Sequence, residues 1–162
     1  MPGTGSSERS LRVVMLADEE FWRLVDMLGG QPEVQDDRPY ERLTSVLSEQ
    51  PVDRIVDFAE ALAFKLHQLD RRVLAQAVLP GADRLSDDDF LYARCAVVVA
   101  GPAAMAAVLA DAAAFERFTT VEAAHAESIL DVPSDAYQKA TGKEWDHVEE
   151  YDYETGSNEQ WW

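Results

Sequence analysis

The sequence predicts an all-α fold, a compact single-domain bundle of about seven helices around one buried central helix. Apolar residues recur at spacings of three and four along most of the chain, which places them on one face of a helix. One segment, residues 90–100, is apolar almost all round, as is typical of a helix in the centre of a fold. A chain of 162 residues can bury roughly 70 % of its unfolded surface, so it needs no disulfide or metal to fold.

Three amphipathic helices are expected in the first half of the chain. The first begins at Asp18, where three acidic residues suit the positive end of the helix dipole, and ends at Gly29-Gly30. The second covers about residues 39–49. The third has Pro51 in its first turn and carries the clearest apolar stripe, which we expect to pack inside the bundle rather than form a coiled coil. The stripe consists of Ile55, Ala59, Leu62, Leu66, Leu69 and Val73.

The central helix follows a loop around Pro80-Gly81 and ends at Gly101-Pro102. The β-branched triplet Val97–Val99 leaves a buried strand as the alternative to a helix. The length of the segment and its start signal favour the helix.

The last third of the chain carries further helix signals. Pro102 can occupy the first position of a helix. The residues TTVE at 119–122 match a capping box, in which Thr119 and Glu122 bond each other's backbone. Pro133 interrupts or divides the helix that follows, and Gly142 is placed to end it.

Both ends of the chain differ from the helical domain expected at residues 18–142. Residues 1–17 are expected to be a partly disordered leader, within which residues 11–16 could be a strand or the beginning of a helix. Residues 143–162 form an acidic, aromatic tail.

The consecutive aspartates Asp87–Asp89 have two interpretations. A Mg²⁺ or Ca²⁺ site would need further oxygen ligands from elsewhere, for example a cation held between Asp83 and Asp89. Alternatively, Ser86 caps the central helix and the aspartates sit at the positive end of its dipole. We favour the cap, because the calcium-loop pattern D-x-[DN]-x-[DN]-G is not met.

No catalytic, cofactor-binding or metal-ligating residue is predicted. The single cysteine, Cys95, lies in the most apolar segment, where burial keeps a thiol inert. Glu122-x-x-His125 has the spacing of half a di-iron site, but such a site needs two of these motifs. His67 is expected at the surface or at the boundary of the core.

The charge of the chain excludes some partners. With 31 acidic and 14 basic residues, the formal net charge is −17, which repels phosphate backbones and makes direct nucleic-acid binding an unfavourable hypothesis. The same charge could attract a basic protein, or serve solubility alone. No secretion signal or membrane span is recognisable, so we expect a cytoplasmic protein that does not bind a membrane.

The tail, KEWDHVEEYDYETGSNEQWW, combines seven acidic residues with a high density of aromatic ones. Three alternatives stay open: its aromatic side chains dock on their own domain, they bind a partner, or the tail is disordered. The candidate partner-binding residues are Trp145, Tyr151, Tyr153, Trp161 and Trp162.

Four stretches of the chain occur in an order that is typical of one family: Phe21-Trp22, the proline-led helix through IVDFAEAL, LSDDDFLYARCAVVVAGP and AYQKATGKEW. On these stretches, the chain resembles the actinobacterial-type domain-of-unknown-function 4240 family. Where that family usually carries a tryptophan-bearing segment, this chain has DRRVLAQAV. The resemblance covers roughly residues 18–145 and implies a mostly helical fold, without implying an activity.

The function expected from the sequence is that of a non-enzymatic interaction or regulatory protein that offers an acidic surface to a basic protein partner. An immunity or inhibitor role against a basic toxin is one concrete form. The alternative is a small-molecule binder or enzyme with a pocket between helices. Its candidate pocket residues are Trp22, Tyr92, Arg94 and His125.

Overall fold

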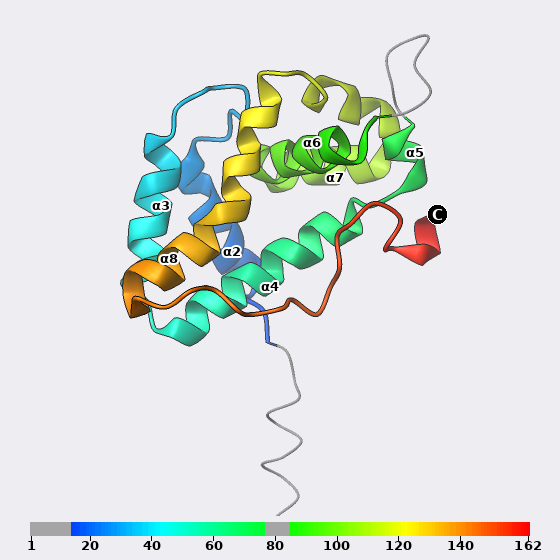
Figure 1. Ribbon diagram of the computed structural model, residues 1–162. Coiled ribbons are helices and arrows are strands. Elements are labelled where there is room, and N and C mark those ends of the chain that lie inside the picture. Colours follow the sequence, from blue (N-terminus) through cyan, green and yellow to red (C-terminus); the bar gives the residue numbers. More distant parts are fainter. Residues whose placement is uncertain (1–13, 77–84) are drawn as a thin grey trace, which may run out of the picture.

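The computed structural model describes residues 14–76 and 85–162, and these residues form helices and no strand, which confirms the all-α prediction (Figure 1). The α-helices are α2 (Asp18–Val25), α3 (Arg38–Ser48), α4 (Val52–Gln68), α5 (Arg72–Ala75), α6 (Asp87–Ala100), α7 (Pro102–Ala110) and α8 (Val132–Thr141). Short 3-10 helices complete the described part: η1 (Asp26–Leu28), η2 (Ala112–Phe118), η3 (Ala123–Asp131) and η4 (Glu159–Trp161).

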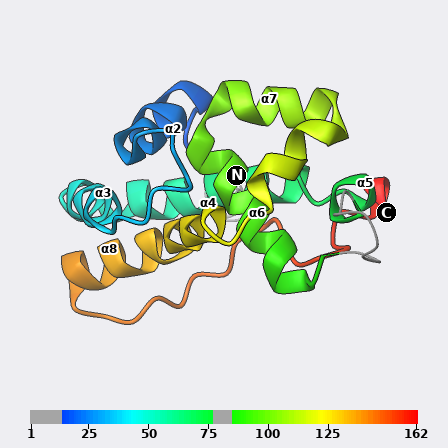
Figure 2. The same cartoon turned by 90° about the horizontal axis from the view of Figure 1, so that it is seen from above.

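Helix α6 is the predicted central helix. Its start is the predicted cap, because the Ser86 hydroxyl accepts a hydrogen bond from the Asp89 amide at 3.1 Å. Gly101, with a φ of 107°, ends it. The strand alternative for Val97–Val99 is wrong, since these residues are helical and buried. Helix α6 packs against α4, α7, η2 and η3, which places it in the middle of the bundle (Figure 2).

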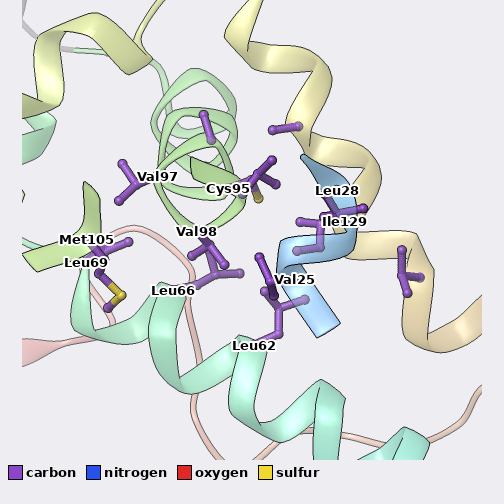
Figure 3. Close-up of a cluster of buried hydrophobic side chains, with 14 of the residues drawn as sticks. Val25, Leu28, Leu62, Leu66, Leu69, Cys95, Val97, Val98, Met105 and Ile129 are labelled. Atoms are coloured by element: carbon purple, nitrogen blue, oxygen red, sulfur yellow. The ribbon is translucent and has the colours of Figure 1, made fainter. Parts of the chain in front are cut away.

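The hydrophobic core is formed where α4 and α6 meet the neighbouring elements (Figure 3). The predicted stripe supplies Leu62 and Leu66 on α4 and Leu69 directly after it, and all three are buried. Side chains from α2, η1, α6, α7 and η3 meet them there, among them Val25, Leu28, Cys95, Val97, Val98, Met105 and Ile129.

The end of α4 differs from the prediction. The apolar stripe was expected to continue to Val73, but α4 ends at Gln68 and Val73 lies on α5 with 56 % of its surface exposed. Arg71 has an extended backbone, with φ −124° and ψ 134°, which a continuous helix does not permit. The intervening Asp70 uses its carboxylate to hold another part of the chain, as described below.

The prediction of a capping box at residues 119–122 is also wrong, because Thr120 and not Thr119 begins the next helix. Thr119 donates its hydroxyl to the Glu116 carbonyl at 2.7 Å and so closes η2. Thr120 instead accepts from the Ala123 amide at 3.1 Å and begins η3. Helix η3 runs directly into α8, where Pro133 lies in the first turn, and Gly142 ends α8 with a φ of 72°, as predicted.

Some predictions concern residues outside the described ranges. The leader falls mostly there, as does the loop around Pro80-Gly81. The first described residues, 14–16, are neither helix nor strand. Leu16 is buried, and its amide donates to the Asp57 carbonyl at 3.2 Å.

Residues 143–162, which we call the C-terminal strap, leave α8 and run in an extended path along α4, where they contact Glu60, Phe64 and His67 (Figure 1). The chain ends beside α5, far from the end of α8 (Figure 1). The strap therefore bridges elements that are distant in the bundle. None of the described helices combines the length and the apolar character that a membrane crossing requires.

The burial of Cys95 leads to a testable prediction. The side chain is fully buried, and burial raises the pKa of its thiol to about 12. We expect no reaction of the native protein with a thiol reagent at pH 8, and complete reaction after unfolding in denaturant, as measured by mass spectrometry. Rapid labelling of the native protein would show that Cys95 is accessible and would contradict the buried position.

Candidate functional site

Three charged residues with an exposed fraction of 0 % define the site: Glu60 on α4, Asp70 after α4 and Arg94 on α6. A buried charge is costly unless it is paired and hydrogen-bonded. All three charged groups form hydrogen bonds with the C-terminal strap. The strap is therefore part of the folded body, because it supplies partners that the buried charges need.

Glu60 holds the first half of the strap. One of its carboxylate oxygens, Oε1, lies 2.5 Å from Nε2 of His147, and the other accepts a hydrogen bond from the Glu150 amide at 3.1 Å. Both oxygens of this carboxylate are thus used by the strap.

Asp70 holds the end of the strap with both carboxylate oxygens. Oδ1 accepts from the Gly156 amide at 3.1 Å and from the Trp162 indole at 2.9 Å. Oδ2 accepts from the Asn158 amide at 2.9 Å and from the Ser157 hydroxyl at 3.1 Å. Four donors on one buried carboxylate fix the backbone of this segment, since hydrogen bonds to a charged acceptor are the stronger kind.

Arg94 lies between the two acidic anchors along the strap. Its Nη1 donates to the Tyr153 carbonyl at 2.8 Å and to the Leu66 carbonyl at 3.1 Å. The guanidinium also lies 4.3 Å from the centre of the Phe90 ring. Burial lowers the pKa of Arg94, while the negative charge of Asp70 acts in the opposite direction.

The strap has two different sides. At alternate positions, the side chains of Trp145, His147, Tyr151 and Tyr153 are partly buried against the body. The intervening acidic residues Asp146, Glu150, Asp152 and Glu154 are exposed. An extended chain places successive side chains on opposite sides, so these rings and the partly buried Glu149 face the body, and an acidic row faces solvent.

The five aromatic residues predicted to bind a partner all contact their own chain. The ring of Trp145 lies 5.4 Å from that of Tyr137, and the ring of Tyr151 lies 4.8 Å from that of Phe64. Tyr153 is the residue whose carbonyl Arg94 binds. The remaining two lie at the chain end. The ring centre of Trp161 lies 3.8 Å from the Arg71 guanidinium, and the Trp162 indole donates to the Asp70 carboxylate. Of the three alternatives, docking on the same domain is the one found here, and partner binding by these residues stays a prediction.

The four residues predicted to line a pocket have different neighbours. The Trp22 ring lies 5.5 Å from Nζ of Lys65. Tyr92 faces Glu127, whose negative charge raises the pKa of the phenol. Arg94 donates to the Leu66 and Tyr153 carbonyls, whereas His125 lies beside Asp37.

His125 and His67 each have a local partner. Nε2 of His125 lies 3.0 Å from Oδ1 of Asp37. His67 is partly buried, as predicted, and its Nδ1 lies 2.7 Å from the Asp152 carbonyl of the strap. Within residues 14–76 and 85–162, no three His, Cys, Asp or Glu side chains are arranged to hold a metal ion.

A hollow of about 280 Å³ lies between the strap and the body, and we call it the strap hollow. Its floor comes from α4, η3 and α8, and its wall from the strap. The lining residues are Ala59, Leu62, Ala63, Leu130, Pro133, Ser134, Trp145, His147, Glu149 and Tyr153. Burial and the nearby Glu149 carboxylate raise the pKa of Tyr153 to about 12.

Sequence reasoning missed Glu60, Asp70 and the strap hollow. Two signals were available. Glu60 stands in an otherwise apolar run, FAEALAF, and the rings of Trp145, His147, Tyr151 and Tyr153 lie two or four positions apart in the tail. A period of two indicates an extended segment with one side packed.

Comparisons with known proteins give a family and no activity. A family model described as "Protein of unknown function (DUF4240)" matches residues 16–139, which is most of the chain and ends before the strap. Neither a curated protein nor a solved structure matches the chain.

The anchoring by Asp70 leads to a testable prediction. Replacing Asp70 with alanine leaves four strap donors without their acceptor, and we expect it to lower the free energy of unfolding by about 3 kcal/mol. Asp146→Ala, which removes an exposed acid of the same strap, is the matched control and should change it by less than about 0.5 kcal/mol. Urea unfolding measures both. Equal effects of the two substitutions would show that Asp70 does not anchor the strap.

Proposed function

The chain belongs to the DUF4240 family, and we propose that it is a non-enzymatic interaction protein whose acidic surface binds a basic protein partner. The observation that supports this proposal is the acidic row of the strap, Asp146, Glu150, Asp152 and Glu154, which is exposed while the backbone beneath it is anchored. The formal net charge of −17 has the sign needed to attract such a partner.

Anchoring favours binding because it reduces the entropy that association would cost. A free acidic tail would have to become ordered on binding, whereas a tail already held by Glu60, Arg94 and Asp70 has lost that freedom during folding. The negative field would also increase the rate at which a basic partner finds this surface. Affinity of this kind decreases with ionic strength, because exposed charges are screened by salt.

The proposal includes a cytoplasmic location, which agrees with a single cysteine that is free. Direct nucleic-acid binding is not part of it, since the net charge repels phosphates. An immunity or inhibitor role against a basic toxin is one form that it could take. A small-molecule binder is the second candidate function, and the observation that favours it is the strap hollow of about 280 Å³.

Charge substitution on the strap tests the proposal. We expect Asp146→Asn, Glu150→Gln and Glu154→Gln together to lower the affinity for a basic partner about tenfold at low salt. The partner is captured from the native host by the unaltered chain, and its affinity is measured by calorimetry. Deleting the strap would be a poor substitute, because it would leave buried charges unpaired.

The matched control removes three exposed acids elsewhere, through Glu19→Gln, Glu33→Gln and Glu122→Gln. It should keep the affinity within about twofold, because the acidic row of the strap is intact. An equal loss of affinity in both variants would show that binding depends on the net charge and not on the strap. No loss of affinity in the strap variant would contradict the proposed surface.

A further inference from the structure

The strap hollow exists because α4 presents small residues beneath the strap. Ala59 and Ala63 are one helical turn apart and both line the hollow. The strap is held on either side of the Glu149 position, by the contact between His147 and Glu60 and by the bond from Arg94 to the Tyr153 carbonyl. These anchors keep the strap in place above the two alanines.

The wall of the hollow combines aromatic rings with one carboxylate. Trp145, His147 and Tyr153 all line it, and the rings of Trp145 and His147 are 5.5 Å apart. Glu149 is partly buried, and its carboxylate forms no hydrogen bond or ion pair with any residue in the described ranges. Its charge reaches Tyr153, whose pKa it raises together with burial.

Aromatic faces beside an unpaired carboxylate are the groups that bind an ammonium ion. An anionic ligand would be repelled by Glu149, and a neutral apolar one would leave this carboxylate unpaired and less hydrated. A volume of about 280 Å³ lies just below the range of roughly 300–1,000 Å³ found for drug-sized ligands, so the hollow suits a single side chain.

We propose that the strap hollow binds a lysine side chain of the basic partner, with its ammonium on Glu149 and its aliphatic stem on Ala59 and Ala63. This inference rests on the proposed function and adds a specific contact to it. Lysine fits better than arginine because its charge is compact and its stem is a flexible apolar chain. The acidic row attracts the partner, and the hollow then binds one lysine of that partner.

The test uses two probes, Nα-acetyl-lysine amide and Nα-acetyl-norleucine amide, which have the same aliphatic stem and differ in the terminal ammonium group. Each is titrated into the ¹⁵N-labelled full chain, and NMR shifts are followed at the Trp145 indole and the amides of Ala59 and Ala63. We expect saturable shifts with the lysine probe and at least about tenfold weaker binding of the norleucine probe.

Three variants locate the binding. Glu149→Gln should weaken the lysine probe about tenfold, and Ala63→Leu should abolish its shifts by filling the hollow. The matched control is Glu144→Gln, which removes an exposed carboxylate of the strap outside the acidic row and should leave binding within about twofold. Equal binding of both probes, or no effect of Glu149→Gln, overturns the inference.

The outcome is separable from that of the proposed function. In one outcome, the charge variant of the strap loses affinity for the basic partner, but Glu149→Gln binds that partner as tightly as the unaltered chain does. This outcome supports the acidic surface and overturns the lysine contact. The lysine probe could instead saturate the hollow while the charge variant of the strap binds the basic partner as tightly as the unaltered chain does. In that case the hollow binds lysine, but the proposal that the basic partner supplies this lysine is overturned.

Discussion

The buried charges of Glu60, Asp70 and Arg94 are the constraint on which the rest of the structure depends. None of the three is exposed, and a charge removed from water must find hydrogen-bond partners or cost several kcal/mol. The helices that carry these residues supply few of those partners. The strap supplies the others, through backbone amides, a carbonyl, His147 and the indole of Trp162. Residues that lie beyond the family match are thus bound to the centre of the bundle.

This constraint also determines what the strap can offer to a partner. Because its backbone is fixed along α4, the alternation of its side chains is fixed too, with the aromatic residues and Glu149 against the body and the acidic row in solvent. The same anchors keep the strap in place above the small residues Ala59 and Ala63, which leaves the strap hollow beside the acidic row. The acidic row and one wall of the strap hollow therefore belong to a single segment.

Much of the fold could be predicted from local sequence signals. The start of α6 at the Ser86 cap and its end at Gly101 depend on neighbouring residues only, as does the apolar stripe of α4 up to Leu69. The continuation to Val73 was wrong because the helical spacing persists in the sequence although the backbone is extended at Arg71, next to the Asp70 that binds the strap. The candidate site was harder to find, since Glu60 and His147 are 87 residues apart in sequence. No local pattern identifies such a pair, although a spacing of two or four positions between the rings of the tail is typical of an extended segment packed on one side.

The most direct test is amide and indole hydrogen exchange at the end of the strap. The Trp162 indole N–H is hydrogen-bonded to Asp70, whereas Trp161, which stacks on Arg71 and is 44 % exposed, serves as an internal control. We expect the Trp162 indole and the Asn158 amide to exchange as slowly as core amides of α4, and the Trp161 indole to exchange rapidly. Rapid exchange of both indoles and of the Asn158 amide would show that the strap is not held by the buried charges.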